Sequence, residues 1–354
     1  MNYNKVFFIC DYCADYGGNF LASFNFLATK LSLRGVKVYF IFPEKAKEKK
    51  WEIDFSNSNI LYCKFNDKEL IDTINNHLTK GDHVIVHLNF ISSLFLLKLR
   101  KLCITNIKFI FHQHMAINFG LKQIVKGIIL RLYAPKRIAY IGVSPEVYKD
   151  VEKEVGKEKS YLVLNAIDTD RLKLSNSINT SNILIFGTDY ERKGVDIAIE
   201  AIRNSNISHK CKLLIVTHNV MDVRKLILAQ FGAIPKFVEI LPPVQNVEKL
   251  YRKSFLFLSP SRLEAFGYAV VEAAYSGSQV IISDIPGQNI LSRIPGIKTV
   301  QPENINQLKL KIEKAYVNKY NDRKKTNKEA REYIDNHFSL EYWANRVLKI
   351  YDSL

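Results

Sequence analysis

The sequence has few cysteines and no long apolar run. Five cysteines, an odd number, are scattered through 354 residues, so a disulfide framework is not expected. No apolar stretch approaches the roughly 18 residues of a membrane span. The apolar run from Val6 to Cys10 is also shorter than the apolar segment of a secretory signal, about 7–15 residues. We therefore expect a cytoplasmic protein with reduced thiols.

One pair of cysteines, Cys10 and Cys13, has the spacing of a redox or zinc motif. A thioredoxin-type pair sits at the start of a helix, and a zinc site needs two more ligands at matching spacing. Cys10 instead ends a strand-like run, and no second C-x-x-C or H-x-H follows at the spacing of a zinc finger. We interpret the pair as two reduced loop thiols.

Acidic residues are missing from a long window. The segment from His83 to Pro145 contains no Asp or Glu, and the whole chain carries a formal net charge of +16. The basic residues of this window are Lys98, Arg100, Lys101, Lys108, Lys122, Lys126, Arg131, Lys136 and Arg137. An anionic partner is expected for this half. Nucleic acid is not expected, because no zinc-finger spacing, aromatic-basic RNA motif or isolated basic tail accompanies the charge.

Within this window, "LKQIVKGIILRLY" (121–133) predicts an amphipathic helix. Its apolar residues at helical spacing are Leu121, Ile124, Val125, Ile128, Ile129 and Leu132, and its basic residues are Lys122, Lys126 and Arg131. Such a helix either lies on an anionic membrane surface or packs on a sheet with solvated lysines. The sequence leaves both interpretations open.

Strand-like runs alternate with helix-period segments along the whole chain, which is typical of parallel α/β folds. The first strands are expected at Lys5–Cys10, Val36–Phe42, Ile60–Phe65, Val84–His87, Lys108–Phe111, Ala139–Val143 and Tyr161–Leu164. After the polar stretch "SNSINTSN" (175–182), strands are expected at Ile183–Gly187, Leu213–Thr217, Phe237–Ile240, Phe255–Ser259 and Val280–Ser283. We predict two doubly wound domains, 1–168 and 169–337, with a closing helix at 338–354 that packs back on the first. In such folds ligands bind at the carboxyl ends of the strands.

Two strand ends carry residues suited to a phosphate group. Gly17 and Gly18 follow the first strand and precede a helix, so bare amides at a helix N-terminus can approach a phosphate. Arg192 and Lys193 follow the first strand of the second series and stand next to Gly194, where a helix begins. Two cations beside a helix N-terminus can clamp a diphosphate. Taken alone, each motif is also explained by an ordinary turn.

Two glutamates stand eight residues apart in "SPSRLEAFGYAVVEAAYSGSQVIISD". Glu264 is expected in the loop after a strand, and Glu272 more than one turn into a helix that begins near Gly267. The two carboxylates can accept hydrogen bonds from the hydroxyls of a sugar and a ribose, while amides around Phe266 and Gly267 face the phosphates between them. A helix-capping role would explain Glu264 alone, but not the combined pattern.

The sequence resembles the retaining GT-B glycosyltransferases of the large group often called family 4, or glycosyl transferases group 1. The resemblance covers almost the whole chain. Its elements are Gly17-Gly18, "VLNAID" (163–168), "FGTDYERKGVD" (186–196), "PSRLEAFGYAVVEA" (260–273) and "FSLEYWANRVLKIYDSL" (338–354). The E-x7-E of the fourth element is the family's most specific signature, and all five occur in the expected order.

The resemblance implies two Rossmann-like domains with a donor cleft between them. The first domain would bind the acceptor, and the second a nucleoside-diphosphate sugar, most commonly a UDP-sugar. The implied catalytic residues are Glu264, His112, Arg192 and Lys193, and the implied donor-binding residues are Gly17, Gly18, Arg192, Lys193, Phe266, Gly267 and Glu272. Glu272 would bind the donor ribose, and Glu264 would touch the transferred sugar. His114 is the alternative to His112, which is favoured because it directly follows a strand.

Several positions depart from the pattern of the family, among them Ala166, where glycine is common. Thr188 stands where an arginine is common, and Gln288 and Asn289 stand where an acidic residue is frequent. In addition, Asp168-Thr169-Asp170 looks like the metal-binding D-x-D of the other major glycosyltransferase fold. It lies in the interdomain junction, so we predict a loop or helix cap there, and no metal. The cation pair can stabilise the leaving diphosphate instead.

The resemblance therefore implies a retaining, metal-independent glycosyltransferase with no cofactor beyond its nucleotide-sugar donor. We expect a lipid-linked or surface-polysaccharide acceptor of bacterial envelope glycan synthesis, and a peripheral position on the inner face of the cell membrane. The acid-free window motivates both expectations. The alternatives are a noncatalytic membrane-binding scaffold and a GT-B relative such as a nucleotide-sugar epimerase or a sugar-phosphate synthase. A dinucleotide-dependent oxidoreductase would need G-x-G-x-x-G after a strand, and this chain has only Gly-Gly.

Overall fold

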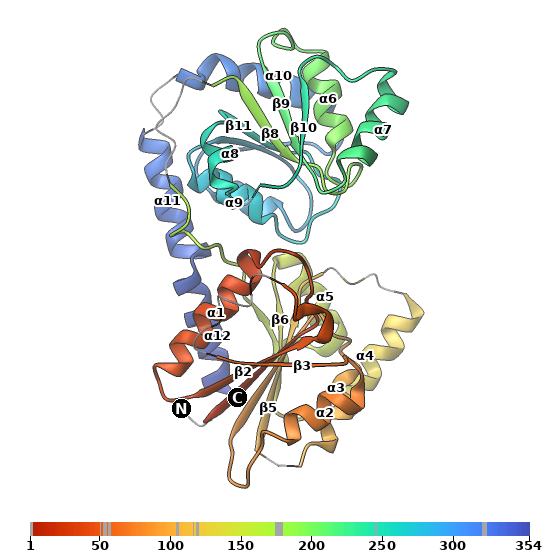
Figure 1. Ribbon diagram of the computed structural model, residues 1–354, viewed down its shortest axis with the longest axis vertical. Helices are drawn as coiled ribbons and strands as arrows, with labels where there is room; N and C mark the ends of the chain where they lie inside the picture. The colour runs from red at the N-terminus through yellow and green to blue at the C-terminus, as the bar shows by residue number, and fades with distance from the viewer. Residues whose placement is uncertain are drawn as a thin grey trace. The chain divides into compact units, whose positions relative to one another are not determined.

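The computed structural model describes residues 3–49, 51, 55, 58–103, 106–115, 117, 120–173, 180–244, 246–320 and 324–354. The chain divides into two compact units: unit 1 is Met1–Ala166 with Leu340–Leu354, and unit 2 is Ile167–Ser339. Each unit contains one parallel sheet with helices on both of its faces (Figure 1). Residues 174–179, which include most of the polar stretch 175–182 before the second series of predicted strands, lie outside the described residues.

The sheet of unit 1 has the strand order β3-β2-β1-β4-β5-β6-β7, and all neighbours are parallel. Its strands are β1 (Lys5–Cys10), β2 (Lys37–Pro43), β3 (Asn59–Cys63), β4 (Val84–Asn89), β5 (Ile107–Gln113), β6 (Ile138–Gly142) and β7 (Ser160–Leu162). Its helices are α1 (Gly18–Ser32), α2 (Asp67–Asn75), α3 (Phe95–Lys98), α4 (Leu121–Tyr133), α5 (Pro145–Val155) and α12 (Leu340–Ser353). Single 3-10 turns lie at η1 (Glu44–Ala46), η3 (Leu99–Lys101) and η4 (Lys157–Lys159). The strand order reverses between β1 and β4, which marks the switch point where such sheets bind ligands.

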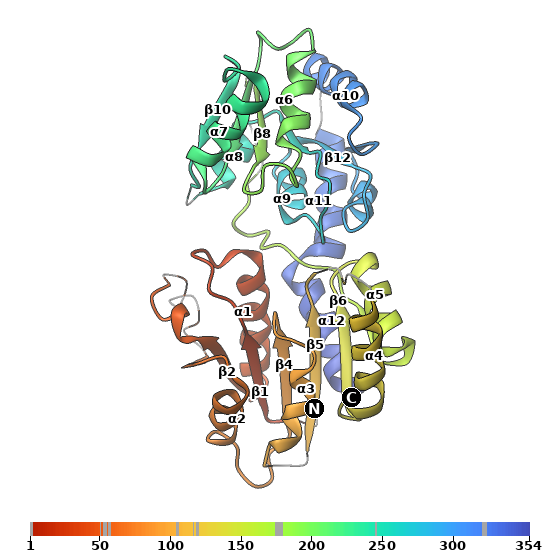
Figure 2. The same cartoon turned by 90° about the vertical axis from the view of Figure 1, so that its right-hand side faces the viewer.

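Both faces of this sheet are covered, so its strands are apolar throughout instead of alternating with polar residues. Val6 and Phe8 of β1 belong to the core shared with α1 and α12, whereas Phe7 belongs to the core on the opposite face. Helices α1 and α12 lie side by side (Figure 2), and the rings of Phe24 and Trp343 join them at 5.1 Å between centroids. The last helix of the chain is therefore part of unit 1.

The sheet of unit 2 has the strand order β10-β9-β8-β11-β12-β13, again all parallel. Its strands are β8 (Asn182–Phe186), β9 (Lys212–Val216), β10 (Val238–Leu241), β11 (Leu256–Ser259), β12 (Gln279–Ser283) and β13 (Ile297–Val300). Its helices are α6 (Val195–Arg203), α7 (Val220–Phe231), α8 (Glu248–Arg252), α9 (Tyr268–Tyr275), α10 (Ile305–Val317) and α11 (Lys324–Phe338), with 3-10 turns η5 (Asn289–Arg293) and η6 (Asn318–Tyr320). The switch point of this sheet lies between β8 and β11.

The predicted fold class, two Rossmann-like doubly wound domains, is confirmed, although the bounds of every predicted strand except β1 differ from those of the structure by one or two residues. Strand β13 was not predicted, because the polar residues Lys298 and Thr299 interrupt its apolar pattern. The fifth strand was predicted to end before His112, whereas β5 continues to Gln113, so His112 lies inside the strand and does not follow it. Among the described helices, none is both long and apolar enough to cross a membrane.

Candidate functional site

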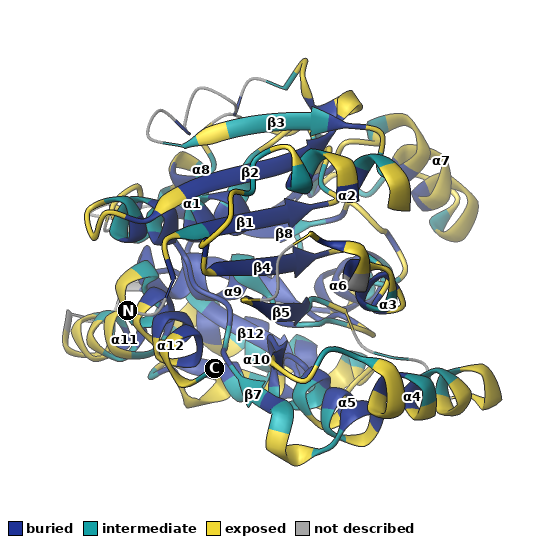
Figure 3. Ribbon diagram, turned by 90° about the horizontal axis from the view of Figure 1, so that it is seen from below, coloured by how far each residue is buried: buried dark blue, intermediate teal, exposed yellow. Residues whose placement is uncertain are grey.

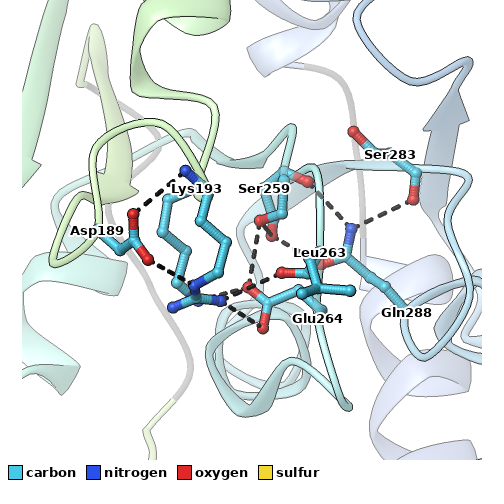
Figure 4. A network of polar contacts seen from close by, with 9 residues as sticks. Asp189, Lys193, Ser259, Leu263, Glu264, Ser283 and Gln288 are labelled. Carbon is cyan, nitrogen blue, oxygen red and sulfur yellow. Dashed lines mark hydrogen bonds and ion pairs between the residues drawn. The ribbon is translucent and has the colours of Figure 1, made fainter. Parts of the chain in front are cut away.

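Three charged side chains meet where β8 and β11 end, on the two sides of the switch point of unit 2 (Figure 4). The Lys193 Nζ contacts the Glu264 Oε1, and the Arg192 Nη1 lies 3.6 Å from the Glu264 Oε2. The Glu264 side chain is only 9% exposed, whereas 36% of Arg192 and 24% of Lys193 remain exposed. Two partly exposed cations therefore converge on one nearly buried carboxylate.

The turn that carries these cations depends on Gly194. This residue has a φ of 66°, and a Cβ at its position would run into the carbonyl oxygen of Pro260. Glycine thus permits the left-handed backbone and also lets the turn pack directly on the loop after β11. Helix α6 begins at the next residue, so the N-terminal end of this helix lies beside Arg192 and Lys193. Cations and helix amides together suit a phosphate group.

The arginine of this pair is held in place by neutral and acidic groups. Its Nε donates to the Asp189 Oδ2 at 2.9 Å, and its Nη1 donates to the carbonyl oxygen of Leu263 at 3.1 Å (Figure 4). Glu264 in turn accepts a hydrogen bond from the Ser261 hydroxyl at 3.2 Å. The two loops of the switch point are therefore joined by side-chain and backbone contacts on both sides of Arg192.

The loop after β11 leads into α9, the helix of the E-x7-E signature. Gly267 precedes α9 with a φ of 100°. The side chain of Phe266 is buried, with its ring centroid 5.4 Å from that of Tyr268 and 5.7 Å from that of Phe338. Phe266 therefore anchors the loop through its ring, and what this segment can offer a ligand is the backbone near the start of α9.

Gln288, which stands where the family often has an acidic residue, is fully buried. Its Nε2 donates to the carbonyl oxygens of Ser259 at 3.0 Å and Ser283 at 3.2 Å, and its Oε1 accepts from the Ser259 hydroxyl at 2.8 Å (Figure 4). The amide of Gln288 thus ties together the ends of β11 and β12. Its role in the structure is to support the loop of Glu264.

Glu272 has its own set of contacts within α9 and its surroundings. Its Oε2 accepts a hydrogen bond from the Tyr251 hydroxyl at 2.6 Å, and its Oε1 contacts the Arg171 Nη2. Burial and the neighbouring carboxylate raise the pKa of Tyr251 well above its usual value, so this hydroxyl remains a donor. Neither Tyr251 nor Arg171 was predicted from the sequence, because both lie far from Glu272 along the chain and belong to no motif.

Arg262 is a third residue of this site that was not predicted from the sequence. Its backbone N–H donates to the carbonyl oxygen of Arg192 at 2.8 Å, and its Nη1 donates to that of Glu191 at 2.5 Å. The guanidinium also bonds both carboxylate oxygens of Asp196, at 2.9 and 2.7 Å, and the Glu303 Oε1 at 2.7 Å. Arg262 therefore fixes the turn of the cation pair to the first turn of α6. Its only signal in the sequence was its place inside "PSRLE".

In unit 1, Gly17 and Gly18 form the start of α1. Gly18 has a φ of 57°, and a Cβ at Gly17 would lie 3.3 Å from the Cβ of Trp51. The Trp51 indole donates to the carbonyl oxygen of Ala14 at 2.9 Å and so closes the loop after β1. In the described structure no side chain caps α1, which leaves amides at its N-terminus for an anion.

Three histidines stack at the carboxyl ends of β4 and β5. The His87 Nε2 lies 3.1 Å from the His112 Nδ1, and the rings of His112 and His114 are 4.5 Å apart. His112 is 1% exposed, and its Nε2 has no hydrogen-bond partner among the described residues, whereas His114 is half-buried. Burial lowers the pKa of His87 and His112 well below the usual range, and that of His114 to about 3. The cluster is uncharged at neutral pH, and His114 is the member that reaches the surface.

The remaining motifs of the sequence lie in loops or strands. The Asp170 N–H donates to the Asp168 Oδ1 at 3.2 Å, so the D-x-D segment forms a loop, as predicted. Cys10 is a buried free thiol at the end of β1, and Cys13 is an exposed free thiol. The described residues hold no cluster of three or more His, Cys, Asp or Glu side chains placed to bind a metal ion.

Comparisons with known proteins agree with the resemblance seen in the sequence. Residues 168–333 match the model of the family Glycosyl transferases group 1. One similar protein is an uncharacterized 41.2 kDa protein in the cps region of Klebsiella pneumoniae, 26% identical over 245 residues. That match covers 66% of this chain and 66% of the other protein.

Two solved structures share the whole fold. A glycosyltransferase from Rickettsia africae ESF-5 superposes with a TM-score of 0.82 at 20% identity, covering 100% of this chain and 99% of the other. Anabaena Alr3699/HepE in complex with UDP and glucose superposes with a TM-score of 0.77 at 15% identity, covering 99% and 100%. These matches confirm the predicted resemblance to GT-B glycosyltransferases.

Proposed function

We propose, from the premise that residues 168–333 form a glycosyl transferases group 1 domain, that the protein moves a sugar from a UDP-sugar to a hydroxyl group of an acceptor. The acceptor is a lipid-linked or surface-polysaccharide chain of bacterial envelope glycan synthesis. The observation that carries the proposal is the convergence of Arg192 and Lys193 on Glu264 at the switch point of unit 2. The bound UDP of the Anabaena structure and the cps region of the Klebsiella protein support the choice of donor and acceptor.

In the proposed reaction, the bond between the anomeric carbon and the diphosphate oxygen breaks, and negative charge develops on the leaving diphosphate. Arg192 and Lys193, with the amides at the start of α6, stabilise that charge. The acceptor oxygen forms a new bond to the anomeric carbon from the same face, and its hydroxyl proton passes to the departing diphosphate. The configuration of the sugar is thus retained without a metal ion. Positioning and preorganised charge supply most of the rate acceleration.

The other site residues take the roles that the resemblance implies. Glu272 binds the donor ribose and shares its carboxylate with the donors Tyr251 and Arg171. Glu264 releases its cations to the diphosphate and accepts a hydroxyl of the transferred sugar. The backbone at Gly267 contacts the phosphates, and the resemblance implies a phosphate contact for the backbone of Gly17 and Gly18 as well.

The histidine cluster supplies a neutral contact to the sugar. His112 is the residue that the resemblance favours, and its buried Nε2 is free of partners among the described residues. His114 stacks on His112 at 4.5 Å and lies nearer the surface, so it makes the direct contact if the ring of His112 stays buried. Either ring would act as a neutral hydrogen-bonding group, because burial keeps both uncharged.

The protein works on the cytoplasmic side of the cell membrane, attached to its surface. The acid-free basic window from His83 to Pro145 supports this position, because anionic headgroups attract basic surfaces. A lipid-linked acceptor would also lie in that surface.

Titration calorimetry with UDP in the presence of a chelator tests the proposed donor site. The double variant Arg192→Gln, Lys193→Gln should bind UDP at least about 100-fold more weakly, because each hydrogen bond to a charged group contributes about 1.5–3 kcal/mol. The matched control is Lys210→Gln, an exposed lysine just before β9. Equal UDP affinity in the double variant and the control would contradict the assignment.

A second measurement separates a transferase from the other GT-B relatives. The wild-type chain should release UDP from a UDP-sugar when envelope lipid extract is supplied as acceptor. Conversion of the UDP-sugar into its epimer without UDP release would identify a nucleotide-sugar epimerase. If neither the wild-type chain nor Lys210→Gln binds UDP, the result favours the noncatalytic scaffold.

A further inference from the structure

Helix α4 (Leu121–Tyr133) presents its apolar side chains outward, at one edge of unit 1. In Figure 3 most of its ribbon has the colour of exposed residues. The exposed fractions are 83% for Leu121, 56% for Ile124, 54% for Val125, 53% for Ile128 and 68% for Leu132. These five residues recur at helical spacing, so they form one continuous stripe, which we call the α4 stripe.

The opposite face of α4 is fixed to α5 by polar contacts. The Lys126 Nζ lies 3.2 Å from the Glu154 Oε1, and the Gln123 Nε2 donates to the same oxygen at 2.6 Å. Arg131 donates to the carbonyl oxygens of Glu154 at 3.0 Å and Lys153 at 2.6 Å. Two of the three basic side chains of this helix therefore contact α5, which differs from the interpretation of a packed helix with solvated lysines.

Gly127 fixes the orientation further. It is buried, and a Cβ at its position would lie 2.9 Å from the carbonyl oxygen of Glu154, so the backbone of α4 packs closely on α5. Rotating α4 to bury the α4 stripe would unpair the buried Glu154 carboxylate and lose this close packing. The outward direction of the α4 stripe is thus enforced by the fold.

An exposed apolar stripe of this kind marks an interaction surface, because monomeric soluble proteins rarely expose contiguous apolar patches larger than roughly a few hundred Å². The charges around it identify the partner. Lys122 on the helix and Lys136 and Arg137 just after it are exposed, and the window from His83 to Pro145 contains no acidic residue. A second copy of the chain would bring these like charges together, whereas a bilayer with anionic headgroups complements them. Tyr133 at the end of α4 is 53% exposed, as suits a ring at a membrane interface.

We propose that α4 lies in the plane of an anionic bilayer, with the α4 stripe among the acyl chains and Lys122, Lys136 and Arg137 on lipid phosphates. Apolar insertion, in addition to the electrostatic attraction proposed above, holds the protein on the membrane. The proposed function explains why membrane attachment is useful, but the docking rests on unit 1 alone and does not depend on donor binding.

Vesicle sedimentation tests this docking with full-length protein. The probes are vesicles of phosphatidylcholine and of phosphatidylcholine mixed with phosphatidylglycerol. The variant Ile124→Gln, Ile128→Gln should partition about 100-fold more weakly onto the mixed vesicles, since burying one such side chain contributes about tenfold or more. Its matched control is Leu310→Gln, Val317→Gln, which replaces two exposed apolar residues of α10. The control should bind like wild type.

Three results would overturn the docking proposal. One is wild-type affinity of the α4 variant for the mixed vesicles, and another is no vesicle binding by the wild-type chain. The third is a wild-type protein that is a dimer in analytical ultracentrifugation and binds no vesicles, while the α4 variant is a monomer. In a second variant, Ile128→Trp, quenching of the new tryptophan by lipids with brominated chains is expected, and no quenching would contradict insertion.

UDP titration of the same proteins keeps the two proposals apart. The α4 variant should bind UDP like wild type, because α4 belongs to unit 1 and the cation pair to unit 2. A wild-type chain that binds mixed vesicles but no UDP would contradict the proposed transferase and still support the docking of α4.

Discussion

The first six strands of unit 1 and the six strands of unit 2 follow the same order, but the two units carry different chemistry at the carboxyl ends of their strands. In unit 2 the loops after β8 and β11 bring together the ions Arg192, Lys193 and Glu264. In unit 1 the ends of β4 and β5 bring together uncharged rings, with His114 stacked between His112 at 4.5 Å and Phe90 at 4.3 Å. The sheet therefore decides where a ligand binds, and the residues at the strand ends decide which ligand it is.

Under the proposed function, this difference suits the two units to chemically different ligand groups. Fixed cations with helix amides suit a diphosphate, since they stabilise charge that is present throughout binding and grows during reaction. A neutral cluster of rings suits an uncharged sugar or acceptor, because it adds apolar contact and hydrogen bonds without a competing charge. Each prediction below changes residues of one unit and compares them with a control variant in the same or the other unit.

The largest effect is expected from removing the charges of unit 2. The double variant Arg192→Gln, Lys193→Gln should release UDP from a UDP-sugar about 1000-fold more slowly, because loss of one preorganised charge-stabilising group already lowers kcat by about 100- to 1000-fold. His114→Gln in unit 1 should slow release by about tenfold, since it alters a neutral hydrogen bond. A stronger effect of His114→Gln would reverse the assignment of the two units. The rate of UDP release, measured with Lys210→Gln as control, decides between them.

The next effect concerns stability of the turn in unit 2. Gly194→Ala should lower the free energy of unfolding by about 3 kcal/mol, because the added methyl group combines left-handed strain with a clash against the Pro260 backbone. Gly232→Ala is the matched control. Gly232 also has a positive φ, of 74°, but open space around its Cβ position, so only the strain of about 1–2 kcal/mol is expected. Urea unfolding followed by circular dichroism measures the free energy of unfolding of both variants. Equal losses would show that the backbone at Pro260 moves to avoid the added methyl group.

The contrast between the units also explains what the sequence could predict of the fold. Strand β1 has the predicted bounds Lys5–Cys10, because a fully apolar run between polar residues is unambiguous. Strand β13 was missed, and β5 extends beyond its predicted end, since His112 and Gln113 do not look like strand residues. Their place in β5 comes from pairing with β4 and β6, which no local pattern reveals.

The candidate site was predictable only where a motif carried it. The predicted proximity of Arg192 and Lys193 follows from their adjacency, but their shared contact with Glu264 requires the sheet to bring β8 beside β11. Arg262 was missed because its partners lie in three separate segments. For α4 the spacing predicted an amphipathic helix correctly, yet periodicity cannot tell which face meets the protein. That choice depends on Glu154 and on the close approach at Gly127.

A pH-dependent effect is expected in unit 1. Buried His87 and His112 have pKa values below the value of about 6.5 for an unfolded histidine, so the unfolded chain binds more protons as the pH falls. Stability is then fully present above pH of about 6.5 and decreases below it, by about 1.4 kcal/mol per pH unit for each such histidine. His112→Phe should reduce this slope by the contribution of one histidine, about 1.4 kcal/mol per pH unit.

The reporter for this measurement is specific to unit 1, because both tryptophans, Trp51 and Trp343, belong to it. Urea unfolding followed by their fluorescence, at pH values between about 7 and about 5, gives the slope. His209→Asn, which removes an exposed histidine of unit 2, should leave the slope unchanged. An unchanged slope in His112→Phe would mean that the buried cluster does not control the acid sensitivity of unit 1.

The smallest effect is expected from Arg262→Gln. Arg262 touches no part of the proposed donor and acts through the turn that it holds to Asp196, Glu191 and Glu303. Because its side chain is 34% exposed and exposed ion pairs contribute only about 0.2–1 kcal/mol each, we expect UDP affinity to fall about threefold to tenfold. The KM for the donor should rise while kcat changes little. Arg262→Lys keeps the charge but not the planar guanidinium group, so its KM should lie between those of wild type and Arg262→Gln. Arg252→Gln, which removes an ion pair within α8, serves as the control. If kcat falls and KM stays constant, Arg262 contacts the reacting diphosphate directly and belongs with Arg192 and Lys193 in the ionic cluster of unit 2.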